Sequence, residues 1–246
     1  MGKISAFYAM PHPPIIIPEV GKGEERKIED TSNACYKIAE EIANIQPDTI
    51  IIITSHGPLF RDAVSLSCEN SINGDLSNFA APQVKFNLNI DIPLTKKIID
   101  HAENEDIPTI EITKDSAYQY GLKYELDHGS MVPLYFINKK YLNYKIVHIT
   151  YGLLPKIQLY KFGMCIKKAV EDIDVNAVFI ASGDLSHRLS KDGPYEYSPY
   201  GKKFDEELIS LLKVGDVTGV FNMDETTVKS AGECGLRSYY IMLGAM

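Results

Sequence analysis

Short runs of β-branched residues alternate along this chain with longer stretches whose apolar residues recur at helical spacing, and this alternation most constrains the fold. The clearest β-branched run is Thr-Ile-Ile-Ile-Ile at residues 49–53, which predicts a strand. Residues 24–45 follow the helical period instead, with Ile28, Cys35 and Ile42 recurring along one face. Strands separated by helices are typical of an α/β fold, with a mostly parallel or mixed central sheet and helices on both faces.

The same two periods place the other expected elements. Residues 69–83 are polar and rich in Asn, Ser and Gly, so we expect a surface loop there. No internal repeat and no linker divides the chain, which favours a single domain over residues 1–246. Strands are predicted at 4–10, 49–54, 63–68, 84–88, 107–112, 144–150 and 177–181, and helices at 24–45, 93–104, 127–138 after a loop, 159–172, 202–213 and 232–246.

Composition and charge exclude several classes of protein. Hydrophobic residues make up 45% and charged residues 24% of the 246, which is ordinary for a soluble globular protein. The formal net charge is −8 without a lysine-arginine stripe, which argues against nucleic acid or an anionic membrane as partner. No apolar run is long enough to span a membrane, and no signal peptide is recognisable. Because the four cysteines form no CxxC pair, we expect a reducing, cytoplasmic location.

Four of the six histidines share a local pattern: they follow or separate apolar segments and are flanked by Pro, Gly, Ser or Asp. Two of them come directly after predicted strands, where proline and glycine turn the chain. Because ligands bind at the carboxyl edge of open α/β sheets, we expect these side chains to gather there. The four are His12, His56, His128 and His187. By contrast, we expect His101 to lie on a solvated helix and His148 to be a hydrogen-bonded core histidine.

A metal site at this edge needs a third ligand, and Glu233 is the best candidate. It lies between glycines, in Ala231-Gly232-Glu233-Cys234-Gly235, where the backbone can pack closely at the start of a short helix. Two histidines and one carboxylate on one face of an Fe(II) ion leave open positions, which oxygen-activating chemistry requires.

Five short motifs occur in chain order: Pro11-His12-Pro13-Pro14, Ser55-His56-Gly57-Pro58, Asp127-His128-Gly129, Ser182-Gly183-Asp184-Leu185-Ser186-His187 and Gly232-Glu233. As an ordered set they resemble the motifs of the class III extradiol dioxygenases, typified by the catalytic subunit of the protocatechuate meta-cleaving enzyme. The resemblance extends from the first motif to the terminal helix, and is strongest to the dioxygenase-like domain of AmmeMemoRadiSam system proteins. Longer members of that system carry a second domain after this one, so one hypothesis is that the chain is the N-terminal part of a longer protein.

The resemblance implies a non-haem Fe(II) enzyme that uses O₂ to open an aromatic ring bearing two adjacent hydroxyl groups. His187 would be the base that takes a proton from the diol, and His128 would lie beside the metal or contact the oxygen. Asp184 would orient the imidazole of His187, as carboxylates commonly do. The implied metal ligands are His12, His56 and Glu233.

Three alternatives remain open at this point. Cys234 adjoins Glu233, and if its thiolate faced the metal, zinc or copper would be favoured over iron; we prefer Glu233 because a hard carboxylate matches the dioxygenase pattern. A metal- or peptide-binding scaffold similar to the Memo proteins would keep the fold without turnover, although His128 and His187 favour the enzyme. A zinc hydrolase could use the same residues. A homodimer that buries strand 84–88 and the apolar terminal helix is also expected.

Overall fold

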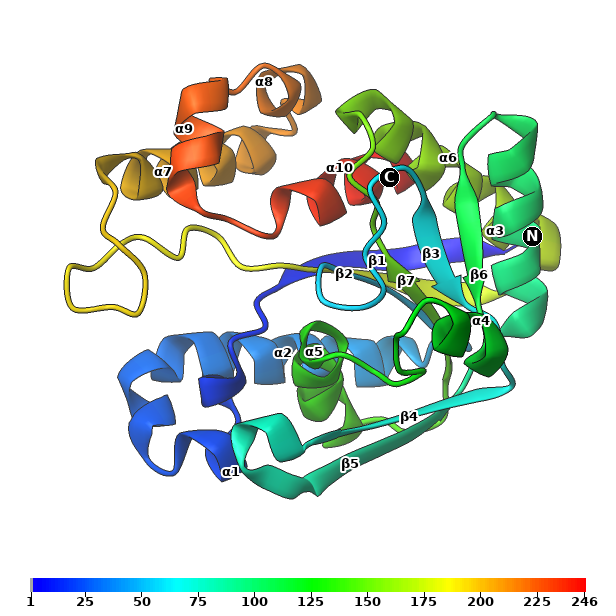
Figure 1. The fold of residues 1–246 in the computed structure, drawn as a ribbon, viewed down its shortest axis with the longest axis horizontal. Helices are drawn as coiled ribbons and strands as arrows, with labels where there is room; N and C mark the ends of the chain where they lie inside the picture. Colours follow the sequence, from blue (N-terminus) through cyan, green and yellow to red (C-terminus); the bar gives the residue numbers. More distant parts are fainter. Residues whose placement is uncertain (1) are drawn as a thin grey trace.

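The predicted α/β architecture is confirmed, and the β-branched runs form a central six-stranded sheet (Figure 1). A computed structural model describes residues 2–246. The strands of this sheet are β1 (Lys3–Met10), β2 (Thr49–Thr54), β3 (Val64–Ser67), β6 (Thr109–Ile112), β7 (Lys145–Thr150) and β8 (Asn176–Ser182). Their order across the sheet is β1-β8-β2-β7-β3-β6. β1, β8, β2 and β7 are parallel, whereas β3 is antiparallel to β7 and parallel to β6, so the sheet is mixed.

Helices cover both faces of the sheet. They are α1 (Pro18–Gly21), α2 (Glu29–Ile45), α3 (Ile92–Asn104), α4 (Lys114–Gln119), α5 (His128–Asn138), α6 (Lys156–Ile173), α7 (Pro199–Val214), α8 (Val217–Phe221), α9 (Glu225–Ala231) and α10 (Leu236–Ala245). Figure 1 shows α2 and α5 on one face, with α3, α6 and α10 on the other. Within residues 2–246, no helix has both the length and the apolar character to cross a membrane.

The strand β2 explains why two hydrophobic cores form. Its side chains alternate between the two faces of the sheet. Ile50 and Ile52 join the core beneath α2 and α5, whereas Ile51 and Ile53 join the core beneath α3, α6 and α10. All four are fully buried, and each contributes about 1.5–3 kcal/mol relative to an exposed side chain. A strand that is apolar on both faces is therefore fixed at the centre of the sheet.

The predicted loop at 69–83 is wrong, because most of this segment forms a two-stranded antiparallel ribbon. β4 (Ser71–Leu76) pairs with β5 (Ala81–Asn89) across a short 3-10 turn at Ser77–Phe79. Ile72 and Leu76 of β4 are buried, while the polar residues between them stay at least partly exposed. The polar composition therefore concealed a strand with one apolar face.

The terminal helix α10 forms as predicted, four residues later than expected, and is buried inside the chain. Tyr239 and Ile241 are 3% and 0% exposed, and α6 packs along the helix. The apolar helix therefore needs no second chain to cover it, and the homodimer stays a prediction.

The parallel strands place their carboxyl ends at one edge of the sheet. Met10 at the end of β1 pairs with Ser182 at the end of β8, and Thr54 of β2 pairs with Thr150 of β7. The segments that follow β1, β2 and β8 therefore leave the sheet side by side, and these segments contain three of the four predicted histidines, His12, His56 and His187.

Candidate metal centre

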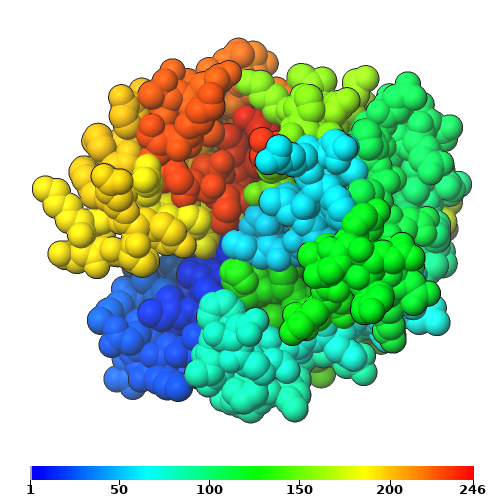
Figure 2. Space-filling view, in the orientation of Figure 1, coloured from blue at the N-terminus to red at the C-terminus, as the bar shows by residue number. Residues whose placement is uncertain are grey.

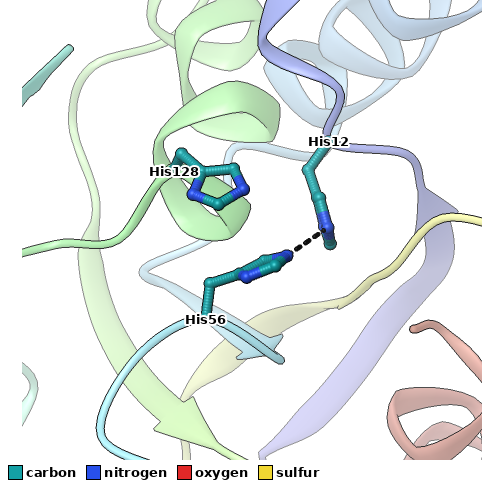
Figure 3. Close-up of side chains that lie close together, drawn as sticks. All are labelled: His12, His56 and His128. Atoms are coloured by element: carbon teal, nitrogen blue, oxygen red, sulfur yellow. Dashed lines mark hydrogen bonds between the residues drawn. The ribbon is translucent and has the colours of Figure 1, made fainter. Parts of the chain in front are cut away.

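His12 and His56 point their ring nitrogens at each other (Figure 3). The Nε2 atoms are 3.0 Å apart. His12 is buried and firmly held: its backbone N–H donates to Asp184 Oδ1 at 2.8 Å, and its Nδ1 lies 2.9 Å from Ser182 Oγ. With Nδ1 engaged by the hydroxyl, Nε2 is the nitrogen that remains for a ligand.

His128 joins these two rings from the first turn of α5. Its ring centroid is 4.0 Å from that of His56, and one ring nitrogen from each of the three histidines lies within 4.8 Å of the others. Burial, together with the neighbouring rings of His56 and His12, lowers the pKa of His128 to about 4. The imidazole is therefore neutral at neutral pH, which is the form that binds metals.

Cys234 brings a sulfur close to His12. Its Sγ is 3.4 Å from His12 Nε2 and 3.8 Å from His187 Nε2, and it accepts a hydrogen bond from the backbone N–H of Asp184 at 3.3 Å. Burial alone would raise the thiol pKa, but hydrogen bonds with His12, His187 and His56 outweigh it and lower the pKa of Cys234 to about 4. The group is a thiolate at neutral pH, and thiolate is the form that binds metals.

Glu233 points away from the histidines. Its carboxylate accepts the backbone N–H of Leu236 at 2.6 Å, at the start of α10, and lines a separate small pocket with Arg237 and Leu154. Burial raises its pKa. In residues 2–246, two groups of donor atoms are close enough to share a metal: His12/His56/His128 and His12/Asp184/Cys234. Glu233 is in neither, so its role as a ligand stays a prediction.

The predicted pair of His187 and Asp184 is in contact. His187 Nε2 lies 3.4 Å from Asp184 Oδ2, and the ring of Tyr195 stacks on the imidazole with centroids 5.1 Å apart. Hydrogen bonds with Asp184 and Cys234 raise the pKa of His187 to about 10. In the metal-free protein this imidazole is therefore protonated at neutral pH.

A pocket of about 1100 Å³ reaches the surface from His56 and His128. Its walls come from β4, β5 and residues 121–127, and Figure 2 shows these teal and green segments meeting the cyan segment after β2 on one face of the molecule. Phe79 borders the inner end, with its ring centroid 5.2 Å from that of His128. A pocket of this size accommodates a molecule larger than a single aromatic ring.

Comparison with known proteins identifies this arrangement. Residues 6–246 match the family model described as the catalytic LigB subunit of aromatic ring-opening dioxygenase. The chain belongs to the LigB family.

Of two curated relatives of this LigB-family chain, one has a name that states an enzyme activity and the other does not. Protein CA_C1420 of Clostridium acetobutylicum is 54% identical over 243 residues, which cover 99% of this chain and 52% of that protein. The chain therefore spans about half the length of that relative. The 3,4-dihydroxyphenylacetate 2,3-dioxygenase of Escherichia coli is 23% identical over 264 residues, which cover 100% of this chain and 91% of that enzyme.

A solved structure shares the fold of this LigB-family chain. The crystal structure of uncharacterized protein JW3007 from Escherichia coli K12 has a TM-score of 0.54 and 13% identity, covering 85% of this chain and 81% of that one. At this identity the likeness concerns the fold alone.

The donor set of the LigB-family site fits a metal ion. Zn–N bonds of about 2.0–2.1 Å and Zn–S bonds of about 2.3 Å bring the ligands of one ion to roughly 3–4 Å from one another. The 3.0 Å between the histidine Nε2 atoms and the 3.4 Å from His12 Nε2 to Cys234 Sγ lie in or near this range. The neutral His128 and the thiolate of Cys234 also have the protonation states that metal binding needs.

Some residues of the LigB-family site escaped sequence reasoning. Tyr195 is 53% exposed and lies in a loop rich in Pro and Tyr. The sequence of this loop did not indicate that the ring would stack on His187. Ser182 is part of the motif at 182–187, but the sequence did not indicate that its hydroxyl would hold the ring of His12. The two histidines expected to be structural are so: His148 is buried and hydrogen-bonded, and His101 contacts Asp172 near the surface.

Proposed function

We propose that this chain is a metal-dependent dioxygenase domain that opens an aromatic ring bearing two adjacent hydroxyl groups, with O₂ as co-substrate and Fe(II) as the metal. The convergence of His12 with His56 and His128, the last two of which line a large pocket, is the observation that carries the proposal. Membership of the LigB family and the distant relative named as a dioxygenase support it. A bound Fe(II) ion would supply open coordination positions for the diol and O₂.

Protein side chains around the site serve for proton transfer, for contact with the metal or an oxygen, and for packing against the substrate ring. His187 is the group for proton transfer, because Asp184 holds its Nε2 and the sulfur of Cys234 lies beside it. Its raised pKa keeps it protonated while the charges of Asp184 and Cys234 are not offset by a cation. Once a bound metal cation offsets these charges, that pKa falls, so the imidazole loses its proton to solvent and then accepts one from the diol hydroxyl. The neutral imidazole of His128 is suited to hold the metal or to hydrogen-bond an oxygen. Phe79 offers an aromatic wall to the substrate ring.

The position of Cys234 supports a second candidate function. A thiolate among the histidines favours zinc or copper, and neither the hard carboxylate of Glu233 nor iron is then required. On this alternative, the chain is a metal-binding protein of the same fold that does not turn over a diol.

The electron paramagnetic resonance spectrum of anaerobically Fe(II)-loaded protein exposed to nitric oxide separates the two functions. Nitric oxide stands in for O₂, so the test does not require the true substrate. We expect an iron–nitrosyl signal that shifts when a simple catechol is added, and we expect His56→Ala to abolish it. His101→Ala is the matched control, since this histidine lies far from the site beside Asp172. A missing signal, or one indifferent to catechol, would favour the metal-binding protein.

A further inference from the structure

We propose that the buried carboxylate of Asp127, anchored by His148, is the positioning group that sets the spacing between His56 and His128. The inference rests on the proposed function in one respect: His56 is a metal ligand and His128 lies beside the metal. Neither Asp127 nor His148 contacts the metal position in this proposal, and both act through the backbone of His56 and His128.

Asp127 and its hydrogen-bond partners form a network with two arms. The first arm holds the backbone of His56. Oδ1 of Asp127 accepts a hydrogen bond from the hydroxyl of Thr54 at 2.6 Å. The oxygen of that hydroxyl in turn accepts the backbone N–H of His56 at 3.2 Å. Because Thr54 is the last residue of β2, the carboxylate fixes the point at which the chain leaves the sheet and turns toward the metal site.

The second arm holds His128. Asp127 is the N-cap of α5, and its Oδ1 also accepts the backbone N–H of Ser130 at 3.1 Å. The hydroxyl of Ser130 donates to Oδ2 at 3.1 Å. His128 is the first residue of this helix, so the same carboxylate orients the turn from which its imidazole projects.

His148 supplies the last contact and fixes the carboxylate itself. Its Nε2 lies 3.0 Å from Asp127 Oδ2, and its Nδ1 lies 2.8 Å from the hydroxyl of Ser67 on β3. The side chains of His148 and Asp127 are only 2% and 7% exposed. With two donors on each oxygen, the carboxylate has no freedom to rotate. Removing one donor would leave part of a buried charge without a partner.

The glycines beside His56 and His128 are packed against this network. A Cβ added at Gly129 would collide with Thr54 Oγ1 and crowd Asp127 Oδ1, and one added at Gly57 would collide with Thr150 Oγ1. The backbone on both sides of the metal site therefore lies directly on the hydroxyls and the carboxylate. Because the packing is this tight, a shift of Asp127 would displace the backbone at His56 and His128.

Cobalt(II) titration of the metal-free protein tests the proposal, with affinity and the visible absorption spectrum as readouts. His148→Leu removes the donor to Asp127, and we expect a 10–100-fold weaker affinity and a changed spectrum, as is usual for partners of ligand-orienting groups. His148→Gln keeps an N–H at the position of Nε2 and should restore most of the affinity. Ser67→Ala removes only the outer contact of His148, so it should fold and show a smaller loss in the same direction.

A matched control separates positioning from general loss of stability. Tyr144→Phe removes another buried side-chain hydrogen bond, to Asn138, away from the site, and should lower stability while leaving cobalt affinity and spectrum unchanged. Histidine-selective NMR of the metal-free protein gives a second readout, in which His148→Leu should move the imidazole signals of both His56 and His128. If wild-type protein binds no cobalt, the proposed function fails and NMR alone decides this inference. Unchanged cobalt binding, or unchanged imidazole signals, in His148→Leu and Ser67→Ala would overturn it.

Discussion

At the scale of single residues, the adjacent side chains of Glu233 and Cys234 make contacts in different parts of the structure. Cys234 turns its sulfur toward His12, whereas Glu233 turns its carboxylate to the first turn of α10. Gly232, with a φ of +64°, gives the backbone a left-handed turn just before this pair. The backbone at this turn therefore places the sulfur, and not the carboxylate, beside His12.

The charge on Cys234 can be measured directly in the metal-free protein. We expect its ultraviolet thiolate absorbance to persist down to a pH of about 4. A lowered pKa means that the thiolate stabilises the fold fully above the ordinary thiol pKa, and that this contribution is lost as the pH falls through about 4. Burial raises the pKa of Cys35 to about 11 and that of Cys68 to about 12, and it also raises that of Cys165, so none of these thiols interferes.

Substitution of the neighbouring imidazole provides the control for this titration. His187→Gln removes a cation that stabilises the thiolate, so the transition should move upward toward the ordinary thiol value. His101→Gln should leave it in place. A single transition near a pH of about 8.5, the value of an unperturbed thiol, would contradict the charged state assigned to Cys234.

At the scale of secondary-structure elements, the packing of α10 on α6 determines where Cys234 sits, because α10 begins just after it. The two helices approach backbone to backbone. A Cβ at Gly163 of α6 would collide with the carbonyl oxygen of Ile241, and one at Gly244 of α10 would collide with the carbonyl oxygen of Tyr160. Glycine is needed at both positions for this close approach.

Gly163→Ala should therefore destabilise the protein by roughly 1–3 kcal/mol through overpacking. Urea unfolding measures the change in the free energy of unfolding. Gly193→Ala is the control: its nearest neighbour, Ser190, would lie 3.6 Å from the added Cβ, and stability should stay the same. Equal stabilities of the two variants would mean that α6 and α10 can separate without penalty.

The sequence predicts elements more readily than it predicts contacts between them. The apolar β2 and the histidine after it were predictable, because a buried strand must end at the ligand-binding edge. β4 was not, because only Ile72 and Leu76 mark its buried face. The contact of His148 with Asp127 was equally hidden, since the two residues lie on different elements. Contacts of this kind depend on sheet order, which local periodicity does not contain.

At the scale of the whole molecule, the candidate metal ligands come from segments spread along the chain. His12 follows β1, His56 follows β2, His128 begins α5 and Cys234 precedes α10. A metal ion that binds these groups in the folded protein alone must stabilise the whole fold, since unfolding disperses its ligands.

Metal addition should raise the free energy of unfolding by about 2.7 kcal/mol at a free metal concentration 100 times Kd, and a chelator should reverse the change. Urea unfolding with and without metal measures this gain. We expect Cys234→Ala to reduce the gain and Glu233→Ala to leave it, because only the sulfur lies among the histidines. The reverse result would restore the ligand role predicted for Glu233.

The distance of 222 positions between His12 and Cys234 has a consequence for the order of events during synthesis. A ribosome makes the chain from its N-terminus, so the three nitrogen donors leave it well before the sulfur. Until α10 has been made and packed against α6, the site contains imidazoles without the thiolate. Any metal preference that depends on the sulfur is therefore acquired only after α10 has been made.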